Sequence, residues 1–325
     1  MTATSFPPQS ASAADSLVDA LSGFIQEKTQ ADFSAIRSNQ SLCAALDFFW
    51  HAQIRLLDVA SPSSKRLQFC APGKPSFFAS VAPDRVRRPK TSANGRCPLC
   101  DYSLLSQGRQ VGIAHGRFRF LINPFPFSER LFTVVRAEDG HVPQGISAAC
   151  VYEVALTLGA RLADMMELAA ELPDFLILHN AGAGASLPHH LHYQALPRWR
   201  RVYPLEFAAR HDAGYFNVPS AYPVAFFVFR AMTPDSILAA LREHWLDLLD
   251  VPGHAHAAAS IIASGANLYV VPRDTRVHAS FPVACLEALG EWVFHDETSA
   301  REACHQRLWE WLASAQDQAL RDLVQ

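Results

Sequence analysis

The sequence predicts an α+β protein in which an antiparallel sheet is flanked by helices and built from two similar units. Three observations support this prediction. Apolar patterns in the middle of the chain give the order strand, strand, helix, strand, strand. A strand, a helix and a strand return in the last third. With 50% hydrophobic and 18% charged residues among 325, the chain can bury a large core, in one large or two medium domains.

The N-terminal segment, residues 1–60, is expected to hold a polar tail followed by helices. Residues 1–14 are rich in Ser, Ala and Pro, which is typical of a disordered tail. Apolar residues recur at helical spacing in Leu17–Phe24 and in Leu42–Leu57.

The first unit, residues 61–200, begins with an irregular stretch rich in proline and basic residues. The basic residues favour a solvated surface, and one short strand is expected at Leu67–Phe69. Phe118–Ile122 and Leu131–Val135 then read as strands that pair with each other. They are separated by the turn-rich segment Asn123–Phe127.

A helix and two more strands complete the first unit. Ser147 is the expected N-cap of the helix, and Pro173 marks its end. Phe175–Leu178 is a continuous apolar run suited to a buried strand, and it leads through a loop of small residues into a further strand. The buried face of the helix follows a 3.6-residue period and consists of Val151, Val154, Leu158, Leu162, Met165 and Leu168.

The second unit, residues 201–325, repeats this order without detectable sequence identity to the first. Strands are expected at Val224–Phe229 and Leu268–Val271. Between them, Thr233 and Pro234 have the character of a helix start. The predicted buried face of that helix is Ile237, Leu241, Trp245 and Leu248.

Charge and cysteine content narrow the class of protein. A formal net charge of −3 argues against a general nucleic-acid binder, which needs a basic surface. The first basic residue is Lys28, and no apolar run approaches the ~20 residues that span a bilayer. We therefore expect a cytoplasmic protein with no membrane partner. The seven cysteines show no disulfide framework, so reduced thiols are expected.

The run Pro188–Gln194 is the strongest chemical signal in the chain. In a β-strand, His190, His192 and Gln194 would share one face, while the residues between them pack behind. The preceding loop, Asn180–Ser186, reads N-A-G-A-G-A-S and lets backbone amides approach an anion. These features predict a nucleotide site.

A metal site is a second hypothesis. Cys97 and Cys100 have the C-x-x-C spacing of a zinc knuckle, and tetrahedral zinc needs two further ligands. The histidine run and His141, in the loop after the second strand, are the best placed to supply them. The competing interpretations are two unligated thiols and a surface histidine.

Taken in order, four motifs resemble one branch of the histidine-triad superfamily. They are C-P-L-C, I-N-P-F, G-H-V-P-Q and N-A-G-A-G-A-S-L-P-H-H-L-H-Y-Q. The branch contains galactose-1-phosphate uridylyltransferase, diadenosine tetraphosphate phosphorylase and GDP-hexose phosphorylases, and the nearest resemblance is to uncharacterised bacterial members. It covers about residues 60–200 and, more faintly, the remainder. The resemblance implies a histidine-triad-like (HIT-like) fold with one active site, in the first unit.

The resemblance also implies a structural zinc ion. Its ligands would be Cys97, Cys100, His141 and His190, and such a closed tetrahedral shell leaves no position for substrate. His189 competes as a ligand, but strand alternation favours His190.

The family's nucleophile falls on His192, whose neutral imidazole would attack an α-phosphorus and form a covalent nucleotidyl-histidine. Hydrolytic relatives carry a third histidine where this chain has Gln194. A glutamine amide orients phosphoryl oxygens without transferring a proton, which favours transfer or phosphorolysis over hydrolysis.

The remaining motif positions imply nucleotide contacts, although each also suits turn chemistry. Asn123 and Phe125 would lie near the base and ribose, and the phosphates would contact Asn180, Gly184 and Ser186.

Two further positions bear on the substrate. Ala185 stands where the uridylyltransferases have cysteine, and the extended uridylyltransferase sequence is otherwise absent, so the resemblance does not extend to uridine or galactose specificity. Arg273 is either a phosphate ligand from the second unit or a surface arginine.

The sequence therefore predicts a nucleotidyltransferase or phosphorylase acting on a nucleoside diphosphate sugar or a dinucleoside polyphosphate, with phosphate or a sugar phosphate as second substrate. The alternatives are a nucleotide hydrolase of the same superfamily and a non-catalytic, zinc-stabilised nucleotide-binding protein. A homodimer is a possible assembly.

Overall fold

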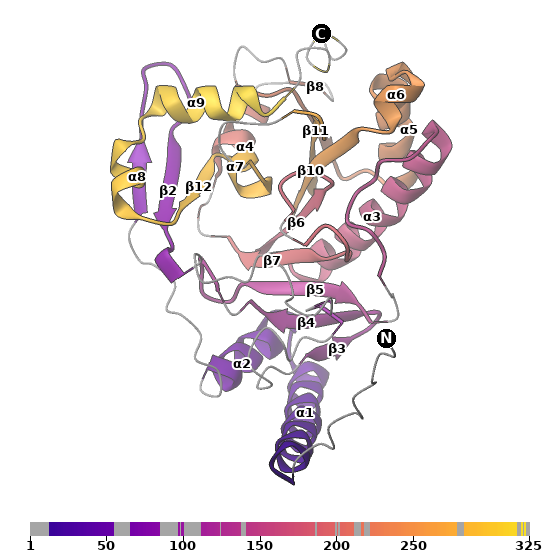
Figure 1. The fold of residues 1–325 in the computed structure, drawn as a ribbon, viewed down its shortest axis with the longest axis vertical. Coiled ribbons are helices and arrows are strands. Elements are labelled where there is room, and N and C mark those ends of the chain that lie inside the picture. The colour runs from indigo at the N-terminus through magenta and orange to yellow at the C-terminus, as the bar shows by residue number, and fades with distance from the viewer. Residues whose placement is uncertain are drawn as a thin grey trace, which may run out of the picture.

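A computed structural model gives the fold of the chain (Figure 1). It describes residues 13–54, 66–84, 97, 99–100, 112–123, 125–137, 141–185, 187–198, 200, 202–210, 216–217, 222–277, 283–316, 320 and 322. The tail expected at residues 1–14 lies outside this part up to residue 12, and Ala13 already belongs to a helix.

The helices and strands follow the predicted alternation. The helices are α1 (Ala13–Asn39), α2 (Leu42–Ile54), α3 (Val151–Glu171), α4 (Pro204–Ala209), α5 (Pro234–His244), α6 (Val251–His254), α7 (Cys285–Leu289), α8 (Glu297–Glu302) and α9 (His305–Ser314), with a 3-10 turn at Leu246–Leu248. The strands are β1 (Arg66–Phe69), β2 (Phe77–Val81), β3 (Ile113–His115), β4 (Phe118–Ile122), β5 (Phe132–Arg136), β6 (Phe175–Ala181), β7 (Tyr193–Pro197), β8 (Phe216–Asn217), β9 (Phe226–Arg230), β10 (Ala257–Ser264), β11 (Asn267–Asp274) and β12 (Glu291–Phe294).

Nine of these strands form one antiparallel sheet in the order β3-β4-β5-β7-β6-β10-β11-β9-β8. Its centre is the pair β6 and β10. Outward from this pair, one half continues through β7, β5 and β4, and the other through β11, β9 and β8. Helix α3 precedes β6 as α5 precedes β10. The sheet therefore has the two pseudo-repeated units that the sequence predicted.

The two units differ where their central strands are connected. Residues 182–192 join β6 to β7 and carry the histidine run. In the second unit, Gly265 and Ala266 alone join β10 to β11, with Gly265 at a φ of 58° that suits glycine. The tight turn leaves no room there for a functional loop.

The two faces of the sheet are covered differently (Figure 1). Strand residues such as Ile177, Phe227 and Ile261 pack on one face against α2, α3 and α5. Alternate residues such as Leu178 and Ile262 pack on the other face against α4, α7, α9 and the three-stranded sheet β1-β2-β12. Because both faces are covered, the central strands β6 and β10 are buried at every position.

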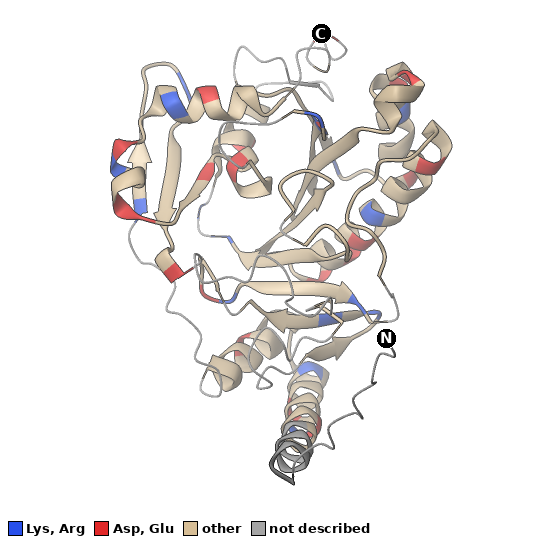
Figure 2. Cartoon of the chain, in the orientation of Figure 1, with Lys and Arg blue, Asp and Glu red and all other residues tan. Residues whose placement is uncertain are grey.

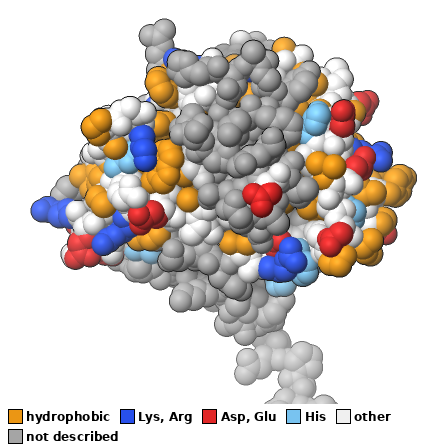
Figure 3. All heavy atoms as spheres, turned by 90° about the horizontal axis from the view of Figure 1, so that it is seen from above, with side chains coloured by type: hydrophobic (Ala, Val, Ile, Leu, Met, Phe, Trp, Pro, Cys, Tyr) orange, Lys and Arg blue, Asp and Glu red, His pale blue; other side chains and the backbone are white. Residues whose placement is uncertain are grey.

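Many charged residues lie on the outer helices (Figure 2), while a few, such as Asp164 and Arg273, are buried. Figure 2 shows residues of both signs spread over the outer helices, with the middle of the central strands largely free of them. From above, apolar, basic and acidic side chains are intermixed on both flanks (Figure 3). No helix in the described segments is long and apolar enough to cross a bilayer.

Helix α1 covers the outer edge of β3 through two glutamines. Gln26 Nε2 donates to Gly112 O at 2.5 Å, and Gly112 N donates to Gln26 Oε1 at 3.1 Å. One turn later, Gln30 Nε2 donates to Ala114 O at 3.1 Å, and Ala114 N donates to Gln30 Oε1 at 2.8 Å. The two amides satisfy edge groups that would otherwise be open to another strand.

Two predictions about the helices were wrong. Ser147 does not cap α3, because its Oγ donates to Ala257 O at 2.9 Å, and the helix begins after Cys150. Leu248 is not on a buried helix face. Helix α5 ends at His244, so Leu248 falls in the following 3-10 turn and is 50% exposed. In both cases a tertiary contact or an early helix end overrides the local pattern.

Candidate metal centre and nucleophile

The histidine run pairs with the loop that follows β5. Leu191 N donates to Val142 O at 2.6 Å, and Gln144 N donates to Pro188 O at 3.0 Å. The strand predicted through Pro188–Gln194 therefore starts only at Tyr193, where β7 joins the sheet. Before it, Pro188 and His189 lie in a turn and His190 in a bend, and the run is hydrogen-bonded to this loop rather than to a sheet strand.

The predicted alternation of side chains holds through the run. Leu191, Tyr193 and Ala195 pack into the core shared with α3. His190 and His192 are buried outside that core, and Gln194 is half-buried on β7. By alternation, these three side chains leave the chain on the opposite side.

Four side chains from three segments converge beside the run. The ligand atoms of Cys97, Cys100, His141 and His190 all lie within 4.8 Å of one another. Cys97 Sγ is 3.3 Å and Cys100 Sγ 3.4 Å from His190 Nδ1, and Cys100 Sγ is 3.5 Å from His141 Nε2. His189, in contrast, is exposed and is not part of this group.

These distances fit a tetrahedral zinc ion. Zn–S bonds of about 2.3 Å and Zn–N bonds of about 2.0–2.1 Å, at tetrahedral angles, place S and N about 3.5 Å apart. Burial and then the adjacent Cys97 thiol raise the pKa of the Cys100 thiol, because two thiolates so close repel each other. A bound cation would reverse that effect. The donor set therefore suits a metal ion of the zinc type.

His192 is oriented by the backbone of His190. Its Nδ1 lies 2.8 Å from His190 O. A carbonyl oxygen can only accept, so Nδ1 carries the proton and the neutral ring keeps its lone pair on Nε2. The geometry presents the nitrogen that a nucleophilic imidazole needs.

The predicted base and ribose contacts coincide with a turn. Asn123 is buried at the end of β4, and its Oδ1 accepts a hydrogen bond from Phe125 N at 3.0 Å. This is an Asx turn, which is the competing interpretation of these residues. Phe125 is half-buried. Any contact of either residue with a nucleotide stays a prediction.

The predicted phosphate loop packs against the second unit. Asn180 Oδ1 accepts a hydrogen bond from Cys285 N at 2.8 Å, which fixes the side-chain amide. Gly184 has a φ of 71°, and a Cβ there would lie 2.6 Å from Val283 O. Only glycine fits this approach. Ser186 lies outside the described residues.

Arg273 is not the surface arginine that one interpretation expected. It is buried, its Nε donates to Ala315 O at 2.8 Å, and its Nη1 donates to Val283 O at 3.2 Å. Burial lowers the pKa of its guanidinium to about 10. Its contacts join β11 to the segment that covers Gly184, while a phosphate contact stays a prediction.

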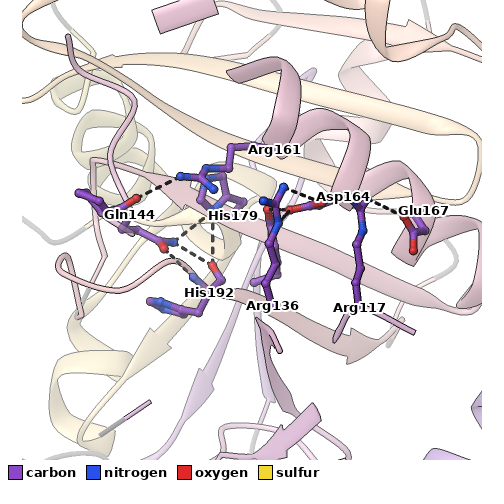
Figure 4. Close-up of polar contacts among 10 residues, drawn as sticks. Arg117, Arg136, Gln144, Arg161, Asp164, Glu167, His179 and His192 are labelled. Carbon is purple, nitrogen blue, oxygen red and sulfur yellow. Dashed lines mark hydrogen bonds and ion pairs between the residues drawn. The ribbon is translucent and has the colours of Figure 1, made fainter. Parts of the chain in front are cut away.

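Sequence reasoning missed a polar network beneath the run (Figure 4). Asp164 on α3 binds Arg136 at 2.7 and 3.0 Å and accepts a hydrogen bond from the Tyr193 hydroxyl. His179 lies against the Tyr193 ring, and burial, more than the charge of Arg161, lowers its pKa to about 3. Of these residues, only Tyr193 had been expected to be buried, and no local pattern indicated the contacts with Asp164 and His179.

Gln144 was also missed as a contact of His192. Its side chain bonds to both main-chain groups of that residue, at 2.8 and 2.9 Å. The glutamine closes the G-H-V-P-Q motif, in which only His141 had an expected role.

Comparisons with known proteins support the fold. A family model described as a domain of unknown function (DUF4922) matches residues 50–197. No curated protein matches the sequence. The crystal structure of yeast Ap4A phosphorylase Apa2 in complex with AMP is similar, with a TM-score of 0.57 and 14% identity over 83% of this chain and 96% of that chain.

Two further structures of the same yeast enzyme agree. The structure without a named ligand has a TM-score of 0.51 and 15% identity, over 90% of this chain and 94% of that chain. The complex with Ap4A has a TM-score of 0.51 and 16% identity, over 90% and 97%. At these identities the likeness shows the fold alone. The chain therefore has the HIT-like α+β fold that its motifs predicted.

Proposed function

We propose that this chain is a nucleotidyltransferase of the phosphorylase type, acting through a covalent nucleotidyl intermediate on His192. The observation that carries the proposal is the 2.8 Å contact between His192 Nδ1 and His190 O. It leaves Nε2 as the unprotonated nitrogen, on a residue buried beside a four-ligand cluster. No other histidine in the described segments combines these features.

The reaction has two steps on the same nitrogen. His192 Nε2 forms a bond to the α-phosphorus while the bond from that phosphorus to the leaving phosphate oxygen breaks. Phosphate or a sugar phosphate then attacks the same phosphorus, the N–P bond breaks, and the imidazole is regenerated. The Nδ1 proton stays on the ring throughout, and His190 O stabilises the positive charge that develops there.

Gln194 would hold the phosphoryl oxygens during both steps. Its amide can donate hydrogen bonds but cannot supply a proton, so the leaving group must depart as a phosphate anion. Nucleoside diphosphate sugars and dinucleoside polyphosphates have such leaving groups. This is the reason to place transfer or phosphorolysis ahead of hydrolysis.

A bound zinc ion would supply structural cross-linking rather than chemistry. The four cluster residues would hold it, and His190 would then be fixed at its ring by the metal and at its carbonyl by His192. The protein's own contribution is a fixed acceptor for the Nδ1 proton.

The neighbours' ligands suggest the first substrate to test. The yeast enzyme is titled an Ap4A phosphorylase, in complexes with AMP and with Ap4A. For this chain we propose an adenine dinucleoside polyphosphate as the substrate. The proposed nucleotide contacts are Asn123, Phe125, Asn180, Gly184 and Ser186. We also propose two units, with boundaries at residues 61–200 and 201–325. A homodimer is the proposed assembly.

The decisive experiment incubates the protein with Ap4A, with and without phosphate, and follows products and protein mass. We expect an AMP adduct on the wild type that is absent from His192→Ala, and release of ADP only when phosphate is added. Phosphate-independent release of AMP would favour the hydrolase. The absence of an adduct with Ap4A and with a panel of nucleoside diphosphate sugars would favour a nucleotide-binding protein.

A further inference from the structure

The side chain of Gln144 makes two hydrogen bonds to the main chain of the proposed nucleophile, His192 (Figure 4). His192 N donates to Gln144 Oε1 at 2.8 Å, and Gln144 Nε2 donates to His192 O at 2.9 Å. We propose that Gln144 is a positioning residue for nucleotidyl transfer, fixing the backbone from which the His192 ring reaches the phosphorus. The inference rests on the proposed role of His192.

The two contacts replace pairing that the sheet does not provide. Strand pairing of β7 with its neighbours begins at Tyr193 and Gln194, so His192 lies one residue outside the ladder. A buried peptide group without partners is costly, and a segment without strand pairing is free to shift. The glutamine amide offers one donor and one acceptor, as a neighbouring strand would.

Gln144 is itself held from three directions. Its backbone N–H donates to Pro188 O at 3.0 Å. The preceding residue, Pro143, accepts a hydrogen bond from Arg161 Nη2 at 3.2 Å. On the side chain, Nε2 also lies 3.1 Å from His179 Nδ1, which accepts in this contact because an amide nitrogen can only donate. The Gln144 side chain is fully buried, so these contacts hold it in one position.

The position of the His192 backbone matters because it sets where the ring lies. With Nδ1 fixed on His190 O, the place of Nε2 follows from where the His192 backbone lies. A displacement of about 1 Å at a reacting atom lowers a rate by about 10²-fold. Loss of Gln144 should therefore slow formation of the adduct while the affinity for nucleotide changes little.

The chain contains a matched control. Buried Gln316 makes the same two-point contact on Ala225, accepting from its N–H at 2.8 Å and donating to its carbonyl at 3.2 Å. Ala225 lies before β9 in the second unit and is not part of the histidine run. Gln316→Met therefore measures the cost of losing such a contact where no nucleophile is held.

The experiment compares Gln144→Met, Gln144→Glu and Gln316→Met with the wild type in single-turnover adduct formation from Ap4A. Rates are expressed per zinc-containing molecule, and the nucleotide concentration for half-maximal rate is measured for each protein. Gln144→Glu retains the acceptor for the His192 N–H but places an oxygen against its carbonyl, so it provides a second variant should Gln144→Met fail to fold.

We expect the adduct rate to fall by about 10²-fold in Gln144→Met, with the half-maximal concentration within about threefold of the wild type. Gln316→Met should be destabilised yet keep the wild-type rate. Wild-type adduct rates in either Gln144 variant, or an equal loss in Gln316→Met, would overturn the inference. A wild type that forms no adduct would instead count against the proposed function.

Discussion

The buried ring of His179 should make the protein less stable in mild acid. The ring is fully buried on β6, and its Nε2 has no hydrogen-bond partner within the described segments. Burial, and then the charge of Arg161, lowers its pKa from 6.5 to about 3. The folded protein therefore binds this proton much more weakly than the unfolded chain does.

The sign and size follow from linkage. A lowered pKa stabilises the fold fully above pH 6.5, and that contribution is lost as the pH falls from 6.5 towards about 3. Between pH 7 and pH 5, the unfolded chain takes up most of one proton that the folded state refuses. This uptake costs about 2 kcal/mol of unfolding free energy.

The assay is urea unfolding of the wild type and His179→Gln at pH 7 and pH 5. Glutamine does not titrate and still offers an oxygen to Gln144 Nε2, so other groups, the metal ligands included, contribute equally to both proteins. The wild type should lose about 2 kcal/mol more than the variant over this interval. An equal loss in both proteins would refute the reasoning.

Three further predictions concern the metal, the ion-pair network and the sheet edge. The wild type should contain about one zinc per chain, and Cys97→Ser should lose both the metal and several kcal/mol of stability in metal analysis and melting, whereas Cys304→Ser should lose neither. Asp164→Asn should cost ~3 kcal/mol in urea, because its arginine partners, 23% and 44% exposed, can partly rehydrate; a loss within error of zero would contradict this. Replacing Gln26 and Gln30 together by alanine should uncover the β3 edge and increase self-association in size-exclusion chromatography, an outcome that unchanged elution would exclude.

Local patterns predicted the elements whose partners lie nearby. Phe118–Ile122 was predicted residue for residue as β4, because its β-forming residues and flanking turn act within one hairpin. Thr233 was correctly expected to start α5, since an N-cap needs only its own next turn.

Long-range contacts decided what could not be predicted. Nothing local to Ser147 indicates that Ala257 O will take its hydroxyl. Gln144 and His192 are 48 residues apart in sequence, and no local pattern at either residue predicts their contact. For the metal site, spacing indicated Cys97 and Cys100 and favoured His141 and the histidine run as the other ligands, while the full set with His190 came from the family resemblance and strand alternation.

Glutamine side chains hold the backbone at four residues: Gly112, Ala114, Ala225 and His192. In each case the hydrogen bonds go to main-chain atoms of the held residue, so its own side chain is not involved. His192 can therefore be replaced by another residue without loss of the two hydrogen bonds from Gln144 to its backbone. His192→Ala should fold and retain metal like the parent protein, which makes it a clean background in which an added imidazole in solution could take over the missing ring.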